Sequence, residues 1–193
     1  MPLEELVRLG TVRPIVRWGT PVLHRTSRPV TDFGDELQSL LADLFATNEA
    51  ARGAGLAAPQ IGVDLAVFVY TCADARWQRQ IGLVCNPTLE LPEGRDRRLV
   101  DEDEGCLSLP GAFIETARPD TAICRGQDQY GNDIEVVGTG MLARCLQHET
   151  DHLNGRVFGD RLSARARKEL YARNEAVAAR YPDDWPVTPL AGE

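Results

Sequence analysis

QHETDHLNG, residues 147–155, is the stretch around which the rest of the sequence is organised. On an α-helix, His148 and His152 project from one face about one turn apart, so their imidazoles can bind one metal ion. Glu149 follows the first histidine, where its carboxylate can act as general base towards a water on that metal. Gly155 is typical of the residue that ends a helix. The stretch therefore predicts a helix that carries an H-E-x-x-H metal site.

Residues before this stretch extend the same helix. Thr139 can cap its first turn. Met141 and Cys145 fall on the helical stripe of His148 and His152, so we expect both to border the metal site. The competing interpretation is a core helix whose two histidines are only hydrogen-bonded.

Composition limits the class of protein. The chain has 193 residues with 43% hydrophobic content, which suits one domain with a substantial core. Its net charge of -8 argues against a nucleic-acid surface. The N-terminus lacks an apolar segment, so we expect neither a secretory signal nor a membrane span. Five cysteines at irregular spacings are not a disulfide framework, and a reducing cytosol fits them best.

Apolar periodicity predicts the other elements. Residues 1–34 favour a wrapping arm with brief strands, in which His24 is structural. A helix should begin at Asp35, capped by its own carboxylate with Gln38 completing a capping box, and end near Gly53. Ser163 can cap a last helix through about Tyr181, followed by an extended tail from Pro182. Strands are expected at residues 65–70, 81–87, 88–91 and 157–158, with a hairpin formed by 122–125 and 134–137.

A run of small residues, GAGLAAPQIG at 53–62, follows the first long helix. Small residues let another backbone approach closely, and Gln60 offers amide donors beside them. The run suits a substrate groove with an oxyanion donor, although a plain helix-to-strand connection explains it as well. The run is not a phosphate-binding loop, because it has neither a G-K-[ST] ending nor a G-x-G-x-x-G spacing.

A catalytic metal usually takes three protein ligands, and a cysteine can supply the third. Cys106 lies in the segment DEDEGCLSLPG, 101–111, where glycine and proline favour presentation from a turn, while the four leading acids suggest an exposed face. Cys145, on the histidine stripe, ranks second. The remaining cysteines adjoin apolar strands and suit the core: Cys72, Cys85 and Cys124.

The same residues bear on other classes of metalloprotein. The metzincin pattern needs a third histidine where Phe158 stands, which excludes that class. A gluzincin-like endopeptidase would take Glu169 or Glu175 as third ligand and is the alternative function. A non-catalytic module with a structural metal is a third interpretation.

Three segments together resemble the signature motifs of peptide deformylases, in order: residues 53–60, 104–108 and 148–152. Gly19–Leu23 and Asn86–Pro87 also look like features of that family. The resemblance covers about residues 12–175. It implies an α+β fold, with antiparallel sheets around a central metal helix plus an N-terminal and a C-terminal helix. It also implies one catalytic domain over residues 1–193, with its core at about 12–175.

The resemblance further implies an activity and a set of site residues. Cys106, His148 and His152 would bind Fe²⁺, for which Zn²⁺, Ni²⁺ or Co²⁺ can substitute. Glu149 would act as general base in hydrolysis of the formyl group of N-formylmethionyl nascent peptides, with Gln60 and the Leu107 N–H stabilising the oxyanion. Substrate-binding positions would be Gly53, Gly55, Glu104, Gly105, Met141, Arg144 and Cys145.

Several points go beyond the shared motifs. Glu104 and Asp151 could orient a ligating histidine or a nearby arginine, and a surface salt bridge is an equal alternative for Asp151. Ala54, Pro59 and Arg144 depart from the family pattern, and these departures bear on the shape of the pocket. We expect a cytoplasmic protein without nucleic-acid or membrane partners. The basic residues of the last helix could contact the ribosome or simply form a solvated face: Arg165, Arg167, Lys168 and Arg173.

Overall fold

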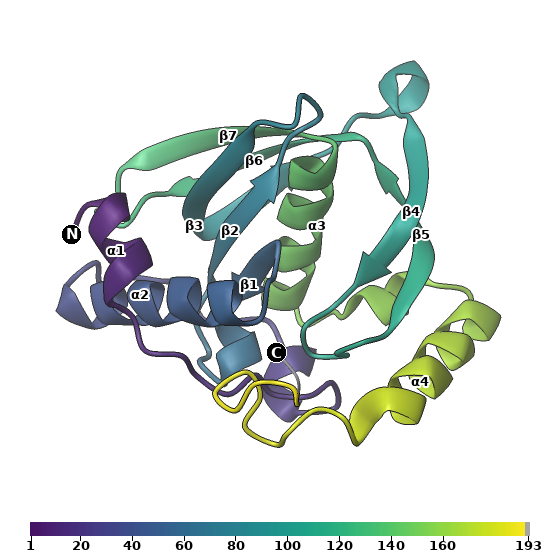
Figure 1. Ribbon diagram of the computed structural model, residues 1–193. Coiled ribbons are helices and arrows are strands. Elements are labelled where there is room, and N and C mark those ends of the chain that lie inside the picture. The colour runs from purple at the N-terminus through teal and green to yellow at the C-terminus, as the bar shows by residue number, and fades with distance from the viewer. Residues whose placement is uncertain (192–193) are drawn as a thin grey trace.

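Alternating apolar residues build a five-stranded antiparallel sheet in the computed structural model, which describes residues 1–191 (Figure 1). The order of strands is β1-β2-β3-β6-β7, so β1 and β7 form its edges. The strands are β1 (Gly55–Ala57), β2 (Val67–Ala73), β3 (Arg79–Glu90), β6 (Thr121–Gln127) and β7 (Asp133–Thr139). The expected hairpin of the last two strands is confirmed.

The two faces of this sheet carry different cores. Val67 and Val69 of β2 face a core shared with helix α2 (Asp35–Ala50), whereas Phe68 and Tyr70 face one shared with α3 (Met141–Leu153). Successive side chains of a strand point to opposite faces, which explains why one apolar run serves both cores. β2 is therefore buried on both sides.

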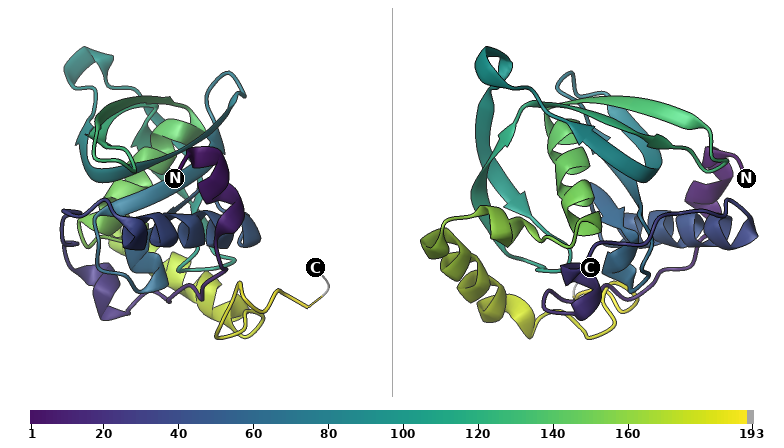
Figure 2. Two further views of the ribbon diagram at one scale, coloured as in Figure 1. Left: turned by 90° about the vertical axis from the view of Figure 1, so that its left-hand side faces the viewer. Right: turned by 180° about the vertical axis from the view of Figure 1, so that it is seen from behind.

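A two-stranded ribbon encloses the other side of α3. β4 (Leu99–Gly105) and β5 (Phe113–Pro119) pair antiparallel, and the views show α3 standing between this ribbon and the larger sheet (Figures 1 and 2). Every residue of α3 except Met141 is buried. The polar residues of the H-E-x-x-H stretch consequently lie in the interior, where they need polar partners.

The ends of α3 agree only partly with the sequence. Thr139 does not cap the helix: it is the last residue of β7, and its Oγ1 accepts a hydrogen bond from Ala75 N. The capping position belongs to Gly140 at φ 57°, a left-handed value that favours glycine at this strand-to-helix corner. The end at Gly155 is confirmed, with φ 71° just beyond the helix.

The N-terminal arm contains helices instead of the expected brief strands. α1 (Leu3–Leu9) buries Leu6 against α2, and residues Pro21–His24 form a short 3₁₀ helix. Thr26 makes only an isolated bridge to Asn154. A seven-residue helix has little periodic signal of its own and is stabilised mainly by packing.

The start of α2 also differs in its capping. Gly34 is the capping residue and no side chain caps the helix, so the expected capping box of Asp35 and Gln38 is wrong. Gln38 instead donates to the carbonyls of Phe33 and Gln129, which ties the helix to the β6–β7 connection.

Two further expectations were wrong in detail. β3 runs unbroken through Glu90, with a register shift between Cys85 and Thr88, where two strands were expected. Such an irregularity bends a strand without ending it. Residues 157–158 form no strand, and a 3₁₀ helix covers Phe158–Arg161. Another 3₁₀ turn spans Gly94–Asp96 in the exposed charged loop.

The C-terminal segment folds back onto the molecule. Ser163 caps α4 (Ala164–Ala178) by accepting from Ala166 N, as expected, but the helix ends before Tyr181. The segment from Pro182 is turned rather than extended, because Trp185 N donates to Pro182 O. Residues 192–193 of the expected tail lie outside the described part. Among residues 1–191, no helix combines the length and the hydropathy required for crossing a bilayer.

Candidate metal centre and substrate cavity

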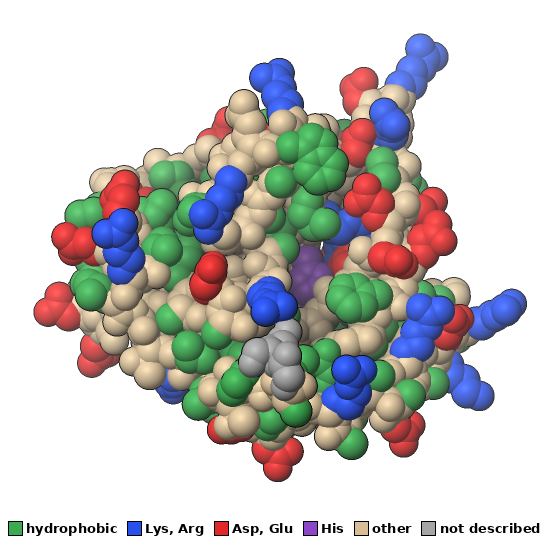
Figure 3. Space-filling view, viewed as in Figure 1, with side chains coloured by type: hydrophobic (Ala, Val, Ile, Leu, Met, Phe, Trp, Pro, Cys, Tyr) green, Lys and Arg blue, Asp and Glu red, His purple; other side chains and the backbone are tan. Residues whose placement is uncertain are grey.

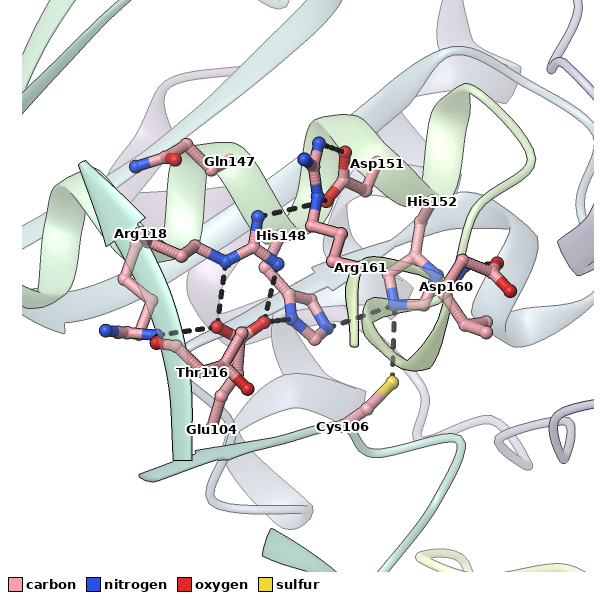
Figure 4. Close-up of polar contacts among 12 residues, drawn as sticks. Glu104, Cys106, Thr116, Arg118, Gln147, His148, Asp151, His152, Asp160 and Arg161 are labelled. Atoms are coloured by element: carbon pink, nitrogen blue, oxygen red, sulfur yellow. Dashed lines mark hydrogen bonds and ion pairs between the residues drawn. The ribbon is translucent and has the colours of Figure 1, made fainter. Parts of the chain in front are cut away.

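Three donor atoms from two segments converge at the centre of the molecule (Figure 4). His148 and His152 lie one turn apart on α3, and their Nε2 atoms are 3.2 Å apart. Cys106 follows the end of β4, with its Sγ 3.3 Å from His152 Nε2. The three atoms lie within 4.8 Å of one another, and all three residues are buried. The structure thus brings together the three predicted metal ligands.

The spacing and chemistry of this group suit a divalent transition metal. A tetrahedral ion with bonds of about 2.0–2.3 Å to nitrogen and sulfur holds its ligand atoms roughly 3.3–3.6 Å apart. The observed separations come close to that range. Two imidazoles and a thiolate form a donor set for a borderline or soft cation, in contrast to the oxygen ligands that Mg²⁺ and Ca²⁺ prefer.

Glu104 holds one of the histidines in place. Its Oε1 lies 2.7 Å from Nδ1 of His148, so the opposite ring nitrogen faces Cys106 and His152. Arg118 donates twice to the same carboxylate, at 2.6 and 2.8 Å, and Arg144 Nη1 donates at 2.8 Å. The expectation that the whole acidic run is exposed is therefore wrong at Glu104, which is buried.

Charges around Glu104 also set its protonation state. Burial alone would raise its pKa, but the hydrogen bonds and charges of Arg118 and His148 outweigh burial and hold the pKa of Glu104 well below its ordinary value. The carboxylate therefore stays ionised near neutral pH. It can therefore accept a hydrogen bond from the Nδ1–H group of His148 near neutral pH.

Asp151 belongs to the same buried network and forms no ordinary surface salt bridge. Arg118 Nη1 donates to its Oδ2 at 3.0 Å, and Arg161 pairs with both carboxylate oxygens. Arg118 thus links Glu104 of β4 to Asp151 of α3 (Figure 4). Neither Arg118 nor Arg161 was found from the sequence, because their partners lie far away along the chain or on another element.

The remaining carboxylate, Glu149, has a different environment. It is buried, and its Oε2 has no hydrogen-bond partner among the described residues. Burial, with smaller effects from neighbouring charges, raises the pKa of Glu149 to about 7. A carboxylate with a pKa near neutrality is suited to accept and return a proton.

The surroundings shift the pKa values of the two histidines in opposite directions. Burial alone would lower the pKa of His148, but hydrogen bonds and charges from Cys106 and Glu104 outweigh burial and raise it well above its ordinary value. Burial and the charge of His148 lower the pKa of His152 well below its ordinary value. The raised pKa favours the protonated form of His148, with which a metal at this centre would compete.

Gln60 and Leu107 present hydrogen-bond donors beside the donor group. Oε1 of Gln60 accepts from Ala57 N at 2.9 Å, which fixes the amide so that Nε2 points towards Cys106 Sγ at 3.7 Å. The same Nε2 donates to Ser108 Oγ at 3.3 Å, a partner with no signal in the sequence beyond its place after the cysteine. The Leu107 N–H donates to no protein acceptor within residues 1–191. Both groups can stabilise a developing oxyanion.

A cavity of about 340 Å³ opens in front of these groups. Figure 3 shows a histidine side chain at the bottom of a hollow that hydrophobic side chains border. All seven predicted substrate-binding residues line the cavity: Gly53, Gly55, Glu104, Gly105, Met141, Arg144 and Cys145. The segment 110–113 and two aromatics, Tyr181 and Trp185, line it as well and were missed.

Arg144 lies in the cavity wall without directing its charge into the cavity. Its guanidinium donates to Glu104, to Thr116 O at 2.8 Å and to Val100 O at 3.0 Å, all on the β4–β5 ribbon. The aliphatic stem is then the part available to a ligand. The arginine at position 144, which departs from the family pattern, therefore changes the polarity of the cavity wall less than a charged residue would suggest.

The alternative ligands of a gluzincin-like site lie elsewhere. Glu169 pairs with Arg173 on the exposed surface of α4, and Glu175 is exposed on the same helix. Neither belongs to the buried donor group, which contains Cys106. This arrangement disfavours the endopeptidase interpretation.

Comparison with known proteins gives one consistent answer. The family described as "Polypeptide deformylase" matches residues 12–168. "Peptide deformylase 1" of Streptomyces avermitilis is 56% identical over 174 residues, which cover 90% of this chain and 80% of the relative. The peptide deformylase of Mycolicibacterium paratuberculosis is 44% identical over 190 residues, which cover 93% of each chain.

Solved structures agree with the sequence relatives. A crystal structure of peptide deformylase from Ehrlichia chaffeensis in complex with actinonin has a TM-score of 0.78 at 31% identity, covering 89% of this chain and 99% of that one. The crystal structure of the Thermus thermophilus peptide deformylase has a TM-score of 0.73 at 39% identity, covering 88% of this chain and 95% of that one. The expected α+β fold is thereby confirmed.

Proposed function

This chain belongs to the polypeptide deformylase family, and on that premise we propose that it hydrolyses the formyl group of N-formylmethionyl peptides and releases formate. The observation that carries the proposal is the convergence of donor atoms from Cys106, His148 and His152 beside a cavity that Cys106, His148 and Glu149 line. We propose that these three residues bind Fe²⁺, for which Zn²⁺, Ni²⁺ or Co²⁺ can substitute.

Glu149 moves the proton in this reaction. A divalent cation held by Cys106, His148 and His152 would supply Lewis acidity, which lowers the pKa of a water molecule. Glu149 accepts a proton from the water whose oxygen attacks the formyl carbon, and the carbon–nitrogen bond of the formyl amide then breaks. Glu149 delivers the proton to the departing amine. The pKa of Glu149 near 7 in the metal-free protein allows the carboxylate both to take and to return it.

Gln60 and Leu107 act on the negative charge that develops on the formyl oxygen. The amide of Gln60 is already oriented by Ala57, and the Leu107 N–H has no competing protein acceptor within residues 1–191. Donors that are oriented in advance stabilise a transition state effectively, and removing one typically costs a factor of about 10²–10³ in turnover.

The substrate backbone has two strand edges available to it. β1 is an edge strand of the large sheet, β4 pairs only with β5, and Gly55 and Gly105 of these strands line the cavity. An extended peptide can hydrogen-bond to such edges. We propose that the methionine side chain enters the part of the cavity beside Met141 and Cys145, against the stem of Arg144.

Formate release tests this function directly. Protein loaded anaerobically with Fe²⁺ should release formate from formyl-Met-Ala-Ser, and Glu149→Gln should reduce kcat by a factor of about 10²–10⁴ while retaining the metal. Cys106→Ser should lose or alter metal binding. Retention of unchanged metal content by Cys106→Ser, with no formate from the wild type, would favour a site built without the thiolate.

We further propose a cytoplasmic location and a transient contact of α4 with the ribosome. Arg165, Arg167 and Lys168 lie on this helix, whereas Arg173 is engaged with Glu169 and with Phe113 O. Replacing the first three by glutamate should weaken co-sedimentation with ribosomes at low salt and leave formate release from a short peptide unchanged. Equal co-sedimentation of both proteins would remove the ribosome contact from the proposal.

A further inference from the structure

The segment after α4 returns to the cavity that holds His148 and Glu149. Tyr181 and Trp185 line this cavity, although they lie beyond residues 12–168, the part that matches the family. Residues 181–185, named here the C-terminal wall, therefore add to the site a surface that the shared motifs do not contain. Figure 1 shows the chain after α4 passing beneath β1.

The C-terminal wall and the proposed methionine site belong to parts of the cavity that pack against different cores. Cys145 packs in the core between the large sheet and α3, whereas Trp185 and Tyr181 pack with the core on the α2 side. His148 and Glu149 line the same cavity. A ligand that filled the whole cavity would contact Cys145 with one side chain and the C-terminal wall with another.

We propose that the C-terminal wall binds the side chain of a residue that follows formyl-methionine in the peptide, and selects a bulky apolar side chain there. This inference rests on the proposed function. The formyl carbon carries only hydrogen besides its oxygen and nitrogen, so the substrate has no side chain on that side of the scissile bond. A second side-chain site can then serve only residues after the methionine.

The chemistry of the C-terminal wall favours an apolar occupant. Tyr181 and Trp185 pack edge to face, with ring centroids 5.2 Å apart and an interplanar angle of 87°. Pro110 and Ala112, in the loop between β4 and β5, line the same cavity. Gly111 in that loop has φ 75°, and a Cβ there would lie 2.9 Å from the Tyr181 hydroxyl, so the loop and Tyr181 are in close contact. These surfaces offer area for an aliphatic or aromatic side chain.

The N-terminal arm holds the C-terminal wall in place. Ile15 N donates to Trp185 O at 2.9 Å, and Arg17 Nη2 donates to Pro182 O at 3.0 Å. The guanidinium carbon of Arg17 lies 5.8 Å and 5.9 Å from the two ring centroids. A binding surface that is already ordered loses little entropy when a ligand arrives.

Selectivity among short peptides tests this proposal. The iron-loaded enzyme is assayed with formyl-Met amide, formyl-Met-Gly-Gly amide, formyl-Met-Leu-Gly amide and formyl-Met-Gly-Leu amide. We expect kcat/KM for one of the leucine peptides to exceed that for the Gly-Gly peptide about tenfold, as is typical of an apolar pocket contact. Tyr181→Ala should bring this ratio close to one and leave kcat/KM for formyl-Met amide within about twofold of wild type.

Two further variants separate selectivity from folding. Because Trp185 is buried, replacing it could disturb folding. The second variant that alters the C-terminal wall is therefore Arg17→Met, which removes the hydrogen-bond donor to Pro182 O and keeps an unbranched side chain. It should lower the same ratio. Tyr130→Ala removes an exposed tyrosine of the β6–β7 connection and should leave the ratio unchanged. Thermal unfolding of each variant confirms that it is folded.

Three outcomes would overturn the inference. These are a leucine preference that persists in Tyr181→Ala, an equal loss for all four substrates, and the absence of any leucine preference in the wild type. Failure of the iron-loaded wild type to release formate from formyl-Met-Ala-Ser would instead reject the proposed function itself, so the two failures are distinguishable.

Discussion

Gly55 and Glu149 approach so closely that no side chain fits between them. A Cβ on Gly55 would lie 2.7 Å from Glu149 Oε1 and 2.6 Å from Cys145 Sγ. Gly55 begins the edge strand β1, and Glu149 lies on the buried helix α3. The glycine therefore determines where the proposed base can lie relative to the peptide-binding edge.

Gly55→Ala should accordingly reduce turnover. The added methyl group forces Glu149 or Cys145 to move, and misplacement of a base by about 1 Å can cost roughly a hundredfold. We expect kcat to fall by about that factor while metal content stays at one ion per chain. Gly34→Ala is the matched control, because Gly34, like Gly55, has no left-handed φ, and its added Cβ would approach only the Asp32 side chain among the described residues beyond its chain neighbours. Unchanged kcat in Gly55→Ala would contradict the tight fit.

Arg144 should affect metal retention more than substrate binding. Arg144→Met keeps an unbranched apolar stem in the cavity wall but removes a donor from Glu104, which orients His148. We expect KM for formyl-Met-Ala-Ser within about twofold of wild type. Release of the metal to a chelator should be roughly 10–100-fold faster, as for other residues that support a metal ligand. Arg144→Ala should show the faster release and also a raised KM, because the stem is lost.

Glu104→Gln should destabilise the fold at neutral pH. The pKa of Glu104 is held well below its ordinary value, so its contribution is present above about pH 4.5 and is lost as pH falls towards the folded-state pKa. Removing one partner of a buried ionic network typically costs about 3–5 kcal/mol. Urea unfolding from pH 3 to pH 7 should show wild type gaining stability over the variant as pH rises. A constant difference across that range would contradict this assignment.

Glu149 should have the opposite effect in metal-free protein. Burial raises its pKa to about 7, so folding favours the protonated acid, and stability is lost as pH rises from about 4.5 through 7. Metal-free Glu149→Gln should therefore exceed metal-free wild type by up to about 3 kcal/mol at pH 8, and match it near pH 4.5. Urea unfolding in the presence of a chelator measures this difference. Equal stability of the two proteins at pH 8 would show that the carboxylate is better solvated than its burial indicates.

Local sequence predicted the two histidines and the base, and it favoured Cys106 as third ligand, but only the resemblance to a family chose Cys106 over Cys145, Glu169 and Glu175. Helical spacing alone places His148 and His152 on one face, and Cys106 was distinguished by its turn-like segment. Arg118 could not be found in this way. It sits on an alternating strand, and its partners Glu104 and Asp151 are 14 and 33 residues away, so only the assembled fold reveals its role.

The boundaries of elements were predicted less well for a related reason. α1 depends on packing against α2, and the corner before α3 depends on the left-handed Gly140 and on Thr139 serving β7. Residues after Pro182 have no periodic pattern, and their turned path follows from contacts with Ile15 and Arg17. In each case a tertiary contact outweighs the local preference.

The position of Cys106 has a consequence for the mechanical coupling of the molecule. Cys106 and His152 are 46 residues apart, and Cys106 lies in the connection between β4 and β5 whereas His152 lies on α3. A cation bound to both residues would act as a reversible cross-link that closes this loop. Once the site is nearly saturated, the free energy of unfolding should rise with the logarithm of the free metal concentration. Removing the cation should loosen the ribbon first, so amide hydrogen exchange in β4 and β5 should accelerate before exchange in β2 and β3.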